Sequence, residues 1–146
     1  IALRHFNCTD QYMICVDELQ HRQYEENLDA AGRRRVWKEL EEKYMPWRHY
    51  ADNEFLNNGG FWMQKPHIFI NPFYYVDYAI AQMSAFEFYQ KMEENREQAW
   101  ADYYKLCQSG GSRSYFDTLE HVGLSNPLKE GTLEKIMAFI GTKISK

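Results

Sequence analysis

The residues between His67 and Gln82 combine an imidazole with a run of tyrosines, and they are the part of this chain best suited to chemistry. Tyr75, Tyr78 and Gln82 recur at steps of three and four, which places them on one face of a helix. Hydroxyl and amide groups on one face can line a cleft and hydrogen-bond a substrate, with His67 over the same opening. The alternative is a fully buried helix whose tyrosines make structural hydrogen bonds. Spacing alone favours this alternative, because aromatic stripes usually pack in a core.

The sequence predicts that this helix begins at Asn71. Asparagine is a favoured N-cap residue, and Pro72 suits the first helical position. Steps of three and four then give a second, apolar stripe on the opposite face, made of Phe73, Val76, Ile80 and Met83. The predicted helix therefore has one apolar face and one aromatic face that ends in hydroxyl groups.

A second group with possible chemistry is the trio Asp17, Glu18 and His21. On a helix these side chains are neighbours, so two carboxylates and an imidazole could bind a metal or transfer protons. A solvated ion-pair face is the favoured interpretation, because such surface groupings are common and weak. Zinc would need a further nitrogen or sulfur ligand, and none occurs at a recognisable spacing.

Length and charge limit the classes of protein to which the chain can belong. Its 146 residues suffice for a single domain, residues 1–146, with a sizeable core. A net charge of −4 does not suit binding to nucleic acid, and an anionic membrane would weakly repel a chain with this charge. No apolar run approaches the roughly 20 residues that span a bilayer. We therefore expect neither nucleic acid nor a membrane as a partner.

The cysteines indicate a reducing compartment. Cys8, Cys15 and Cys107 cannot all pair within the chain, and none belongs to a Cys-x-x-Cys motif. Free thiols and a cytoplasmic location are therefore the expectation.

The chain is predicted to be all-α, with about six helices and no convincing strand alternation. Thr9 or Asp10 is expected to cap a first helix that ends near Glu26, and Asp29 a second that ends at Tyr44. The helix that starts at Asn71 should continue toward residue 94. Later helices are expected over 95–108, after a cap at Ser112 or Ser114, and from Thr132.

Residues 46–66 are predicted to be a long loop with turn chemistry at Asn57-Asn58-Gly59-Gly60. The loop carries aromatic residues at a density that excludes disorder: Trp47, Tyr50, Phe55, Phe61 and Trp62. We expect it to pack against the helices and to deliver the chain to His67.

Several stretches resemble the C-terminal part of oligoendopeptidase F, a relative of thimet oligopeptidase and neurolysin. They are Cys15-Val-Asp-Glu-Leu-Gln-His21, Val36-Trp-Lys-Glu-Leu-Glu-Glu-Lys-Tyr-Met-Pro-Trp47, Asn58-Gly-Gly-Phe-Trp62, Asn71-Pro-Phe-Tyr-Tyr-Val-Asp-Tyr-Ala-Ile-Ala-Gln82 and Gln108-Ser-Gly-Gly-Ser112. The resemblance runs from about Tyr12 onward. It implies part of a larger, two-lobed helical zinc peptidase that cleaves short peptides in a deep channel.

The zinc of that family is held by His-Glu-x-x-His and a further glutamate, and the 146 residues contain no His-Glu-x-x-His. The resemblance therefore implies that zinc belongs to the full-length parent, that this chain binds none, and that the zinc helix lies N-terminal to Ile1. The chain alone should be inactive. Its expected partners are the missing part of the enzyme and short peptides, with self-association through the surface that the missing part would cover.

The resemblance also implies roles for the aromatic stretch on the wall opposite the metal. Tyr78 would donate a hydrogen bond to the oxyanion of the tetrahedral intermediate, and His67 would hold the substrate backbone. Tyr74 and Tyr75 would contact substrate. Thimet oligopeptidase has a glycine-rich loop with its own tyrosine after the histidine, whereas Ile68-Phe-Ile-Asn71 stands here, so a stiffer segment is expected. The competing function is a stand-alone, non-catalytic helical protein that binds peptides.

Overall fold

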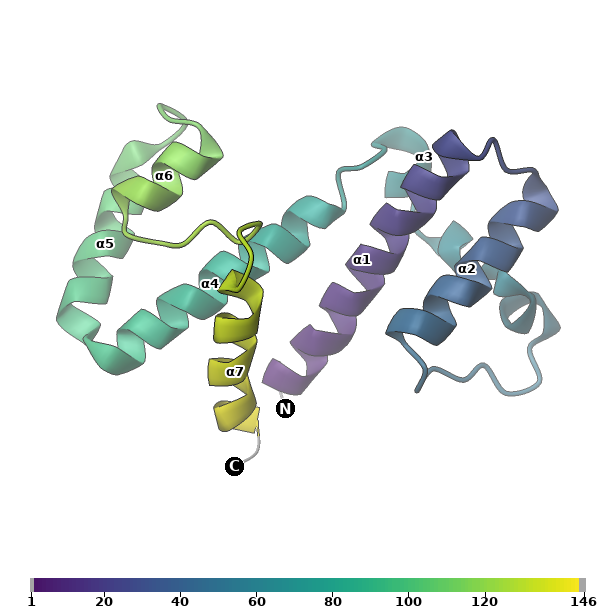
Figure 1. Cartoon of the computed structure of the whole chain (residues 1–146), viewed down its shortest axis with the longest axis horizontal. Coiled ribbons are helices and arrows are strands. Elements are labelled where there is room, and N and C mark those ends of the chain that lie inside the picture. Colours follow the sequence, from purple (N-terminus) through teal and green to yellow (C-terminus); the bar gives the residue numbers. More distant parts are fainter. Residues whose placement is uncertain (1, 145–146) are drawn as a thin grey trace. The chain divides into compact units, whose positions relative to one another are not determined.

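A computed structural model describes the backbone of residues 2–144 and the side chains of residues 11–144. This part of the chain is helical and contains no strand (Figure 1). It divides into two compact units, residues 1–79 and 80–146, and the boundary falls within one helix. None of the described helices is both long and apolar enough to cross a membrane. The all-α prediction is confirmed.

The described residues contain seven α-helices and two short helical turns. The first unit holds α1 (Ala2–Glu25), α2 (Ala30–Tyr44), the turns η1 (Leu56–Gly60) and η2 (Phe61–Gln64), and α3 (His67–Ile70). Helix α4 (Val76–Glu94) contains the boundary. The second unit continues with α5 (Arg96–Ser109), α6 (Tyr115–His121) and α7 (Thr132–Ile144). The predicted long loop of residues 46–66 thus contains two helical turns.

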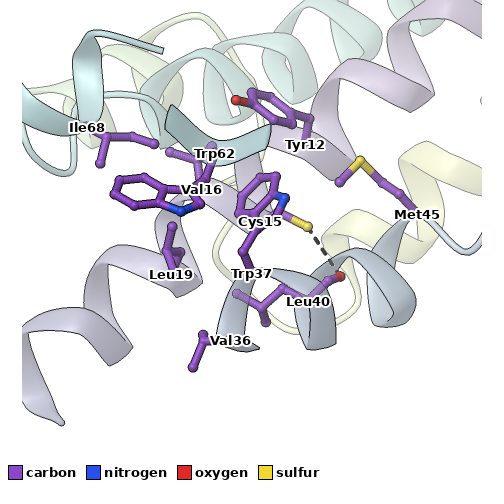
Figure 2. Close-up of a cluster of buried hydrophobic side chains, with 10 residues drawn as sticks. All are labelled: Tyr12, Cys15, Val16, Leu19, Val36, Trp37, Leu40, Met45, Trp62 and Ile68. Atoms are coloured by element: carbon purple, nitrogen blue, oxygen red, sulfur yellow. Dashed lines mark hydrogen bonds between the residues drawn. The ribbon is translucent and has the colours of Figure 1, made fainter. Parts of the chain in front are cut away.

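The core of the first unit forms between α1 and α2, which lie side by side (Figure 1). Figure 2 shows its ten buried side chains: Tyr12, Cys15, Val16, Leu19, Val36, Trp37, Leu40, Met45, Trp62 and Ile68. The Cys15 thiol donates to the Leu40 carbonyl at 3.4 Å, and burial raises the pKa of this thiol to about 12. Cys15 is therefore an unreactive packing residue.

The predicted helix starts differ in accuracy. Asp29 caps α2 as expected, since its carboxylate accepts from the Gly32 amide at 2.6 Å. The predicted start of the first helix is wrong, because α1 begins at Ala2 and includes Thr9 and Asp10. Both residues are capable caps, but a cap acts only where the chain before it leaves the helix.

Gly59 allows the aromatic segment to lie directly on α2. Its backbone is in the left-handed region, with φ of +77°, and a Cβ there would lie 2.1 Å from the Arg34 carbonyl oxygen. Phe61, two residues later, packs on Trp37 with ring centroids 6.4 Å apart. Trp62 is buried and Tyr50 and Phe61 are half-buried, as the composition predicts, whereas Trp47 and Phe55 remain about half exposed.

The predicted helix start at Asn71 and Pro72 is wrong. Helix α3 ends at Ile70, where Asn71 is its C-cap, and α4 begins only at Val76. Between them Phe73 has a φ of +64°, which no residue inside a right-handed helix adopts. Phe73 therefore does not belong to the apolar stripe that was predicted for this helix.

The second unit is tied together by charged and polar groups around Lys91 on α4. Its ammonium group donates to the carbonyls of Val122 and Gly123 at 3.0 and 3.1 Å and pairs with Asp102 on α5 at 2.8 Å. Glu87, one turn earlier on α4, accepts from the Ser125 amide and hydroxyl. A small apolar cluster of Leu119, Val122 and Leu124 lies beside these bonds.

Stability of the second unit is expected to depend on ionised Asp102. Hydrogen bonds from Lys91 above all, and also from Lys105 and Gln98, lower its pKa to about 2. A lowered pKa means that the carboxylate stabilises the folded state above its ordinary pKa of about 4 and that this contribution is lost as pH falls toward 2. Asp102→Asn should therefore lower the thermal midpoint clearly at pH 7 and distinctly less at pH 3, which lies midway between the two pKa values.

Thermal melts of the unsubstituted chain and of Asp102→Asn, followed by circular dichroism at pH 7 and pH 3, test this prediction. Glu97→Gln is the control, because Glu97 is an exposed carboxylate on the same helix. A decrease in midpoint for Asp102→Asn that is equal at pH 7 and pH 3 would show that the charge of Asp102 does not contribute.

Candidate functional site

The structure brings His67, Tyr74, Tyr75 and Tyr78 together, all of them within the first unit. His67 opens α3, Tyr74 and Tyr75 lie in the connection that follows, and Tyr78 lies in the first turn of α4. The centroid of the His67 ring lies 5.1 Å from the ring centroid of Tyr75 and 6.1 Å from that of Tyr74. Tyr78 meets Tyr74 and Tyr75 edge to face, at 5.4 and 5.7 Å between centroids. These are favourable separations for aromatic pairs.

The hydroxyls of this aromatic site reach solvent. Tyr74 and Tyr78 are each 43% exposed, whereas Tyr75 and His67 are half-buried. The Tyr78 hydroxyl donates to that of Tyr74 at 3.3 Å, which is long for a bond between hydroxyls. This hydrogen bond is the largest cause of a raised pKa at Tyr78, with smaller contributions from burial and from the neighbours Tyr74, Tyr75 and Asp77. Tyr78 therefore keeps its proton at neutral pH and can donate it in a hydrogen bond.

His67 has an unusual hydrogen-bonding state. Its Nδ1 is buried and has no hydrogen-bond partner among the residues that the structure describes. Its carbonyl accepts from the Asn71 amide at 2.9 Å, which fixes the short helix that carries the ring. A buried polar atom without a partner destabilises a fold, so such atoms are rare and are often found where a function uses them. The ring is thus held between a tilted contact with Tyr75 and a stacked contact with Tyr74, and its Nδ1 has no partner among the described residues.

Behind the aromatic site lies a layer that the sequence reasoning missed. The ring of buried Tyr12 packs edge to face on Tyr75, at 5.9 Å between centroids. Gln20 on α1 is 2% exposed, and its Oε1 accepts from the Phe73 amide at 2.9 Å. The signal for Gln20 was available: it follows Val16 by one helical turn, so a polar side chain stands on the buried face.

The trio on α1 does not act as one group. The His21 imidazole lies 3.6 Å from Asp17, while Glu18 pairs with Lys43 on α2 at 3.0 Å. Burial raises the pKa of Asp17, with a smaller rise from Asp77 and an opposing effect from His21. Burial also acts on Glu18, but hydrogen bonds from Tyr44 and Lys43 outweigh it and lower that pKa. Glu18 therefore links α1 to α2, while Asp17 and His21 pair within α1, in agreement with the favoured ion-pair interpretation.

The described residues do not form a zinc site. Among them no group of three or more histidine, cysteine, aspartate or glutamate side chains lies close enough to hold a metal ion. His67 is enclosed by tyrosine rings, and phenols are not the ligands of structural or catalytic zinc sites. What this arrangement offers chemically is a set of hydroxyl hydrogen-bond donors on a cluster of aromatic rings.

Comparison with known proteins identifies the family of the chain. The model of peptidase family M3 matches residues 3–138, and the chain belongs to this family. No curated protein sequence matches the chain significantly.

Three solved structures are similar to the chain. A crystal structure of a candidate oligoendopeptidase F has 36% identity and a TM-score of 0.91 over 99% of this chain and 26% of its own. Pz peptidase A with an inhibitor has 36% identity and a TM-score of 0.87, over 92% of this chain and 24% of its own. A candidate oligoendopeptidase F from Bacillus anthracis strain Ames has 32% identity and a TM-score of 0.71, over 94% of this chain and 21% of its own. The chain thus spans about a quarter of the proteins that it resembles.

Proposed function

We propose that this chain forms the substrate-facing wall of an M3 oligopeptidase, with Tyr78 as the hydrogen-bond donor to the transition state. The observation that carries the proposal is the cluster of His67, Tyr74, Tyr75 and Tyr78, with exposed hydroxyls, in a chain of a peptidase family. Its substrates would be short peptides.

The geometry of the two exposed hydroxyls supports this role for Tyr78. When a peptide carbonyl is attacked, its oxygen becomes an oxyanion, which is stabilised by donors already in place. Tyr78 is protonated, and its bond to Tyr74 at 3.3 Å is weak enough to be exchanged for a stronger one. Hydrogen bonds to a charged acceptor are roughly twice as strong as neutral ones. The phenol would therefore turn from Tyr74 to the oxyanion as the negative charge develops.

The other members of the cluster would bind and orient substrate. Tyr74 would accept the Tyr78 hydroxyl between turnovers and so keep it near its working direction. Tyr75 and His67, whose rings pack in a tilted arrangement at 5.1 Å between centroids, would contact the peptide backbone.

The zinc that the resemblance implies would be bound by the rest of the enzyme, because the residues described here do not suit it. Large apolar side chains at the surface of the first unit, such as Phe69 and Ile70, are 58% and 69% exposed. Surfaces of this kind favour contact with the rest of the enzyme or, when that is absent, self-association.

The 146-residue chain alone is expected to cleave no short peptide, with or without added zinc, because its sequence lacks His-Glu-x-x-His. A quenched fluorogenic peptide gives the measurement. The complete enzyme that contains this chain serves as the control and should cleave the same peptide in a chelator-sensitive way. Zinc-dependent cleavage by the purified chain would contradict the proposed division of roles. A complete enzyme that cleaves no peptide of any length would contradict the proposed function.

A further inference from the structure

The connection that carries Tyr74 and Tyr75 is held in a strained conformation. Phe73, directly before the two tyrosines, has a φ of +64°. For a residue with a bulky side chain this conformation is costly and rare, and it persists only where surrounding contacts fix it. The connection is also short, since α3 ends at Ile70 and α4 begins at Val76. Any change at Phe73 is therefore passed directly to the neighbouring tyrosines.

The contacts that fix Phe73 come from α1. The side-chain amide of Gln20 is almost fully buried, and both of its ends are used: Oε1 accepts from the Phe73 amide at 2.9 Å, and Nε2 donates to the Val16 carbonyl at 3.3 Å. The Phe73 ring lies 4.8 Å from the His21 ring and 5.6 Å from the Tyr24 ring. Gln20 makes the directional contact, since a hydrogen bond fixes the position of the peptide group more closely than ring packing does.

We propose that Gln20 is a positioning residue, whose buried amide holds the Phe73 backbone and thereby places Tyr74 and Tyr75 against His67 and Tyr78. The residue does not touch the exposed hydroxyls and acts only through the connection. Any effect of Gln20 on catalysis rests on the proposed function, but the placement of Tyr74 and Tyr75 can be measured in the chain alone.

The first test uses the purified chain and Gln20→Met, which keeps the length of the side chain and removes the acceptor. In nuclear Overhauser spectra of the protein with labelled aromatic rings, cross-peaks should link His67 to Tyr75 and Tyr74 to Tyr78, whose ring centroids lie 5.1 and 5.4 Å apart. We expect Gln20→Met to abolish or strongly weaken these cross-peaks. Val36→Ala is the matched control, because Val36 is a fully buried residue of the same core on α2 and should lower stability while leaving the cross-peaks unchanged.

Two further variants distinguish the effect of the Gln20 hydrogen bond from the effect of side-chain packing. Burial raises the pKa of a carboxyl group, so the protonated side chain in Gln20→Glu offers the same acceptor and donor and should retain the cross-peaks. Phe73→Gly keeps the amide N–H and adopts a positive φ without strain, so it should also retain them. This variant still tests the proposal if Gln20→Met does not fold.

Three outcomes of the NMR experiment would overturn the proposal. They are unchanged cross-peaks in Gln20→Met, equal loss in Val36→Ala, and loss in Phe73→Gly. The last would show that ring packing, and not the amide of Gln20, holds the connection.

The second test uses the complete enzyme and distinguishes the two proposals. Gln20→Met should lower kcat at least tenfold with a smaller change in KM, because a misplacement of about 1 Å can cost a factor of about 10². Gln20→Glu should restore most of the activity. If Tyr78→Phe lowers kcat and Gln20→Met does not, the positioning proposal is wrong and the proposed function stands. If the cross-peaks behave as expected but Tyr78→Phe turns over normally, the proposed function is wrong and the positioning role stands.

Discussion

Replacing Tyr78 with phenylalanine in the complete enzyme is expected to lower kcat by a factor of about 10²–10³, the usual result of removing one donor to an oxyanion. The KM for a short peptide should change only a few fold, because the oxyanion exists in the transition state and not in the bound substrate. The thermal midpoint should hardly move, since the ring keeps its edge-to-face contacts with Tyr74 and Tyr75. Steady-state kinetics and a melting curve on the same preparation give the measurement.

Tyr75→Phe is the comparison for this prediction. Tyr75 is half-buried behind the exposed hydroxyls, so the loss of its hydroxyl should affect kcat much less. Normal turnover in Tyr78→Phe together with a lower melting temperature would contradict the proposed role. The Tyr78 hydroxyl would then be a structural group, as the tyrosine spacing by itself suggested.

Gly59→Ala is expected to destabilise the first unit by about 2–5 kcal/mol. Two costs combine: an L-residue in the left-handed region costs about 1–2 kcal/mol, and forcing atoms into a packed contact costs about 1–3 kcal/mol. The added methyl group would lie 2.1 Å from the Arg34 carbonyl oxygen, which belongs to the backbone of α2 and cannot move aside. Denaturant unfolding followed by tryptophan fluorescence suits this unit, because Trp37, Trp47 and Trp62 lie in it.

Gly131→Ala separates the two costs. Gly131 has a φ of +80°, and no atom lies within 4 Å of the position that a Cβ would occupy. It should therefore show the conformational cost alone, measured in the second unit by circular dichroism. Equal destabilisation by the two substitutions would mean that the close approach of Gly59 to α2 is not what limits this position.

The sequence predicted the parts of the structure that depend on local patterns. Apolar spacing predicted an all-helical chain, and local cap chemistry located the start of α2 at Asp29. Of the two candidate caps Ser112 and Ser114, the structure uses Ser114, whose hydroxyl accepts from the Asp117 amide at 3.2 Å. The rings of Tyr75 and Tyr78 are neighbours, as their spacing suggested, but Tyr75 lies before the start of α4 and not on a face of that helix as predicted.

What the sequence could not predict are features that distant residues determine. Asn71 and Pro72 carry a strong local signal for a helix start, but α3 ends there. A contact across 53 positions, in which Gln20 accepts a hydrogen bond from the Phe73 amide, holds this segment in the fold. No local pattern around Phe73 contains this information, so the true start of α4 and the layer behind the tyrosines appear only in the fold.

The edge-to-face rings behind the aromatic site form a continuous row from the core to the surface. Trp37 meets Tyr12 at 5.6 Å, Tyr12 meets Tyr75 at 5.9 Å, and Tyr75 meets Tyr78 at 5.7 Å. Tyrosines that absorb ultraviolet light pass their excitation efficiently to a tryptophan at such short range. Energy absorbed by the exposed Tyr78 can therefore be transferred to the fully buried Trp37 and emitted there. A ligand bound against Tyr78 would alter this transfer, so tryptophan emission under tyrosine excitation is expected to change on binding without any attached dye.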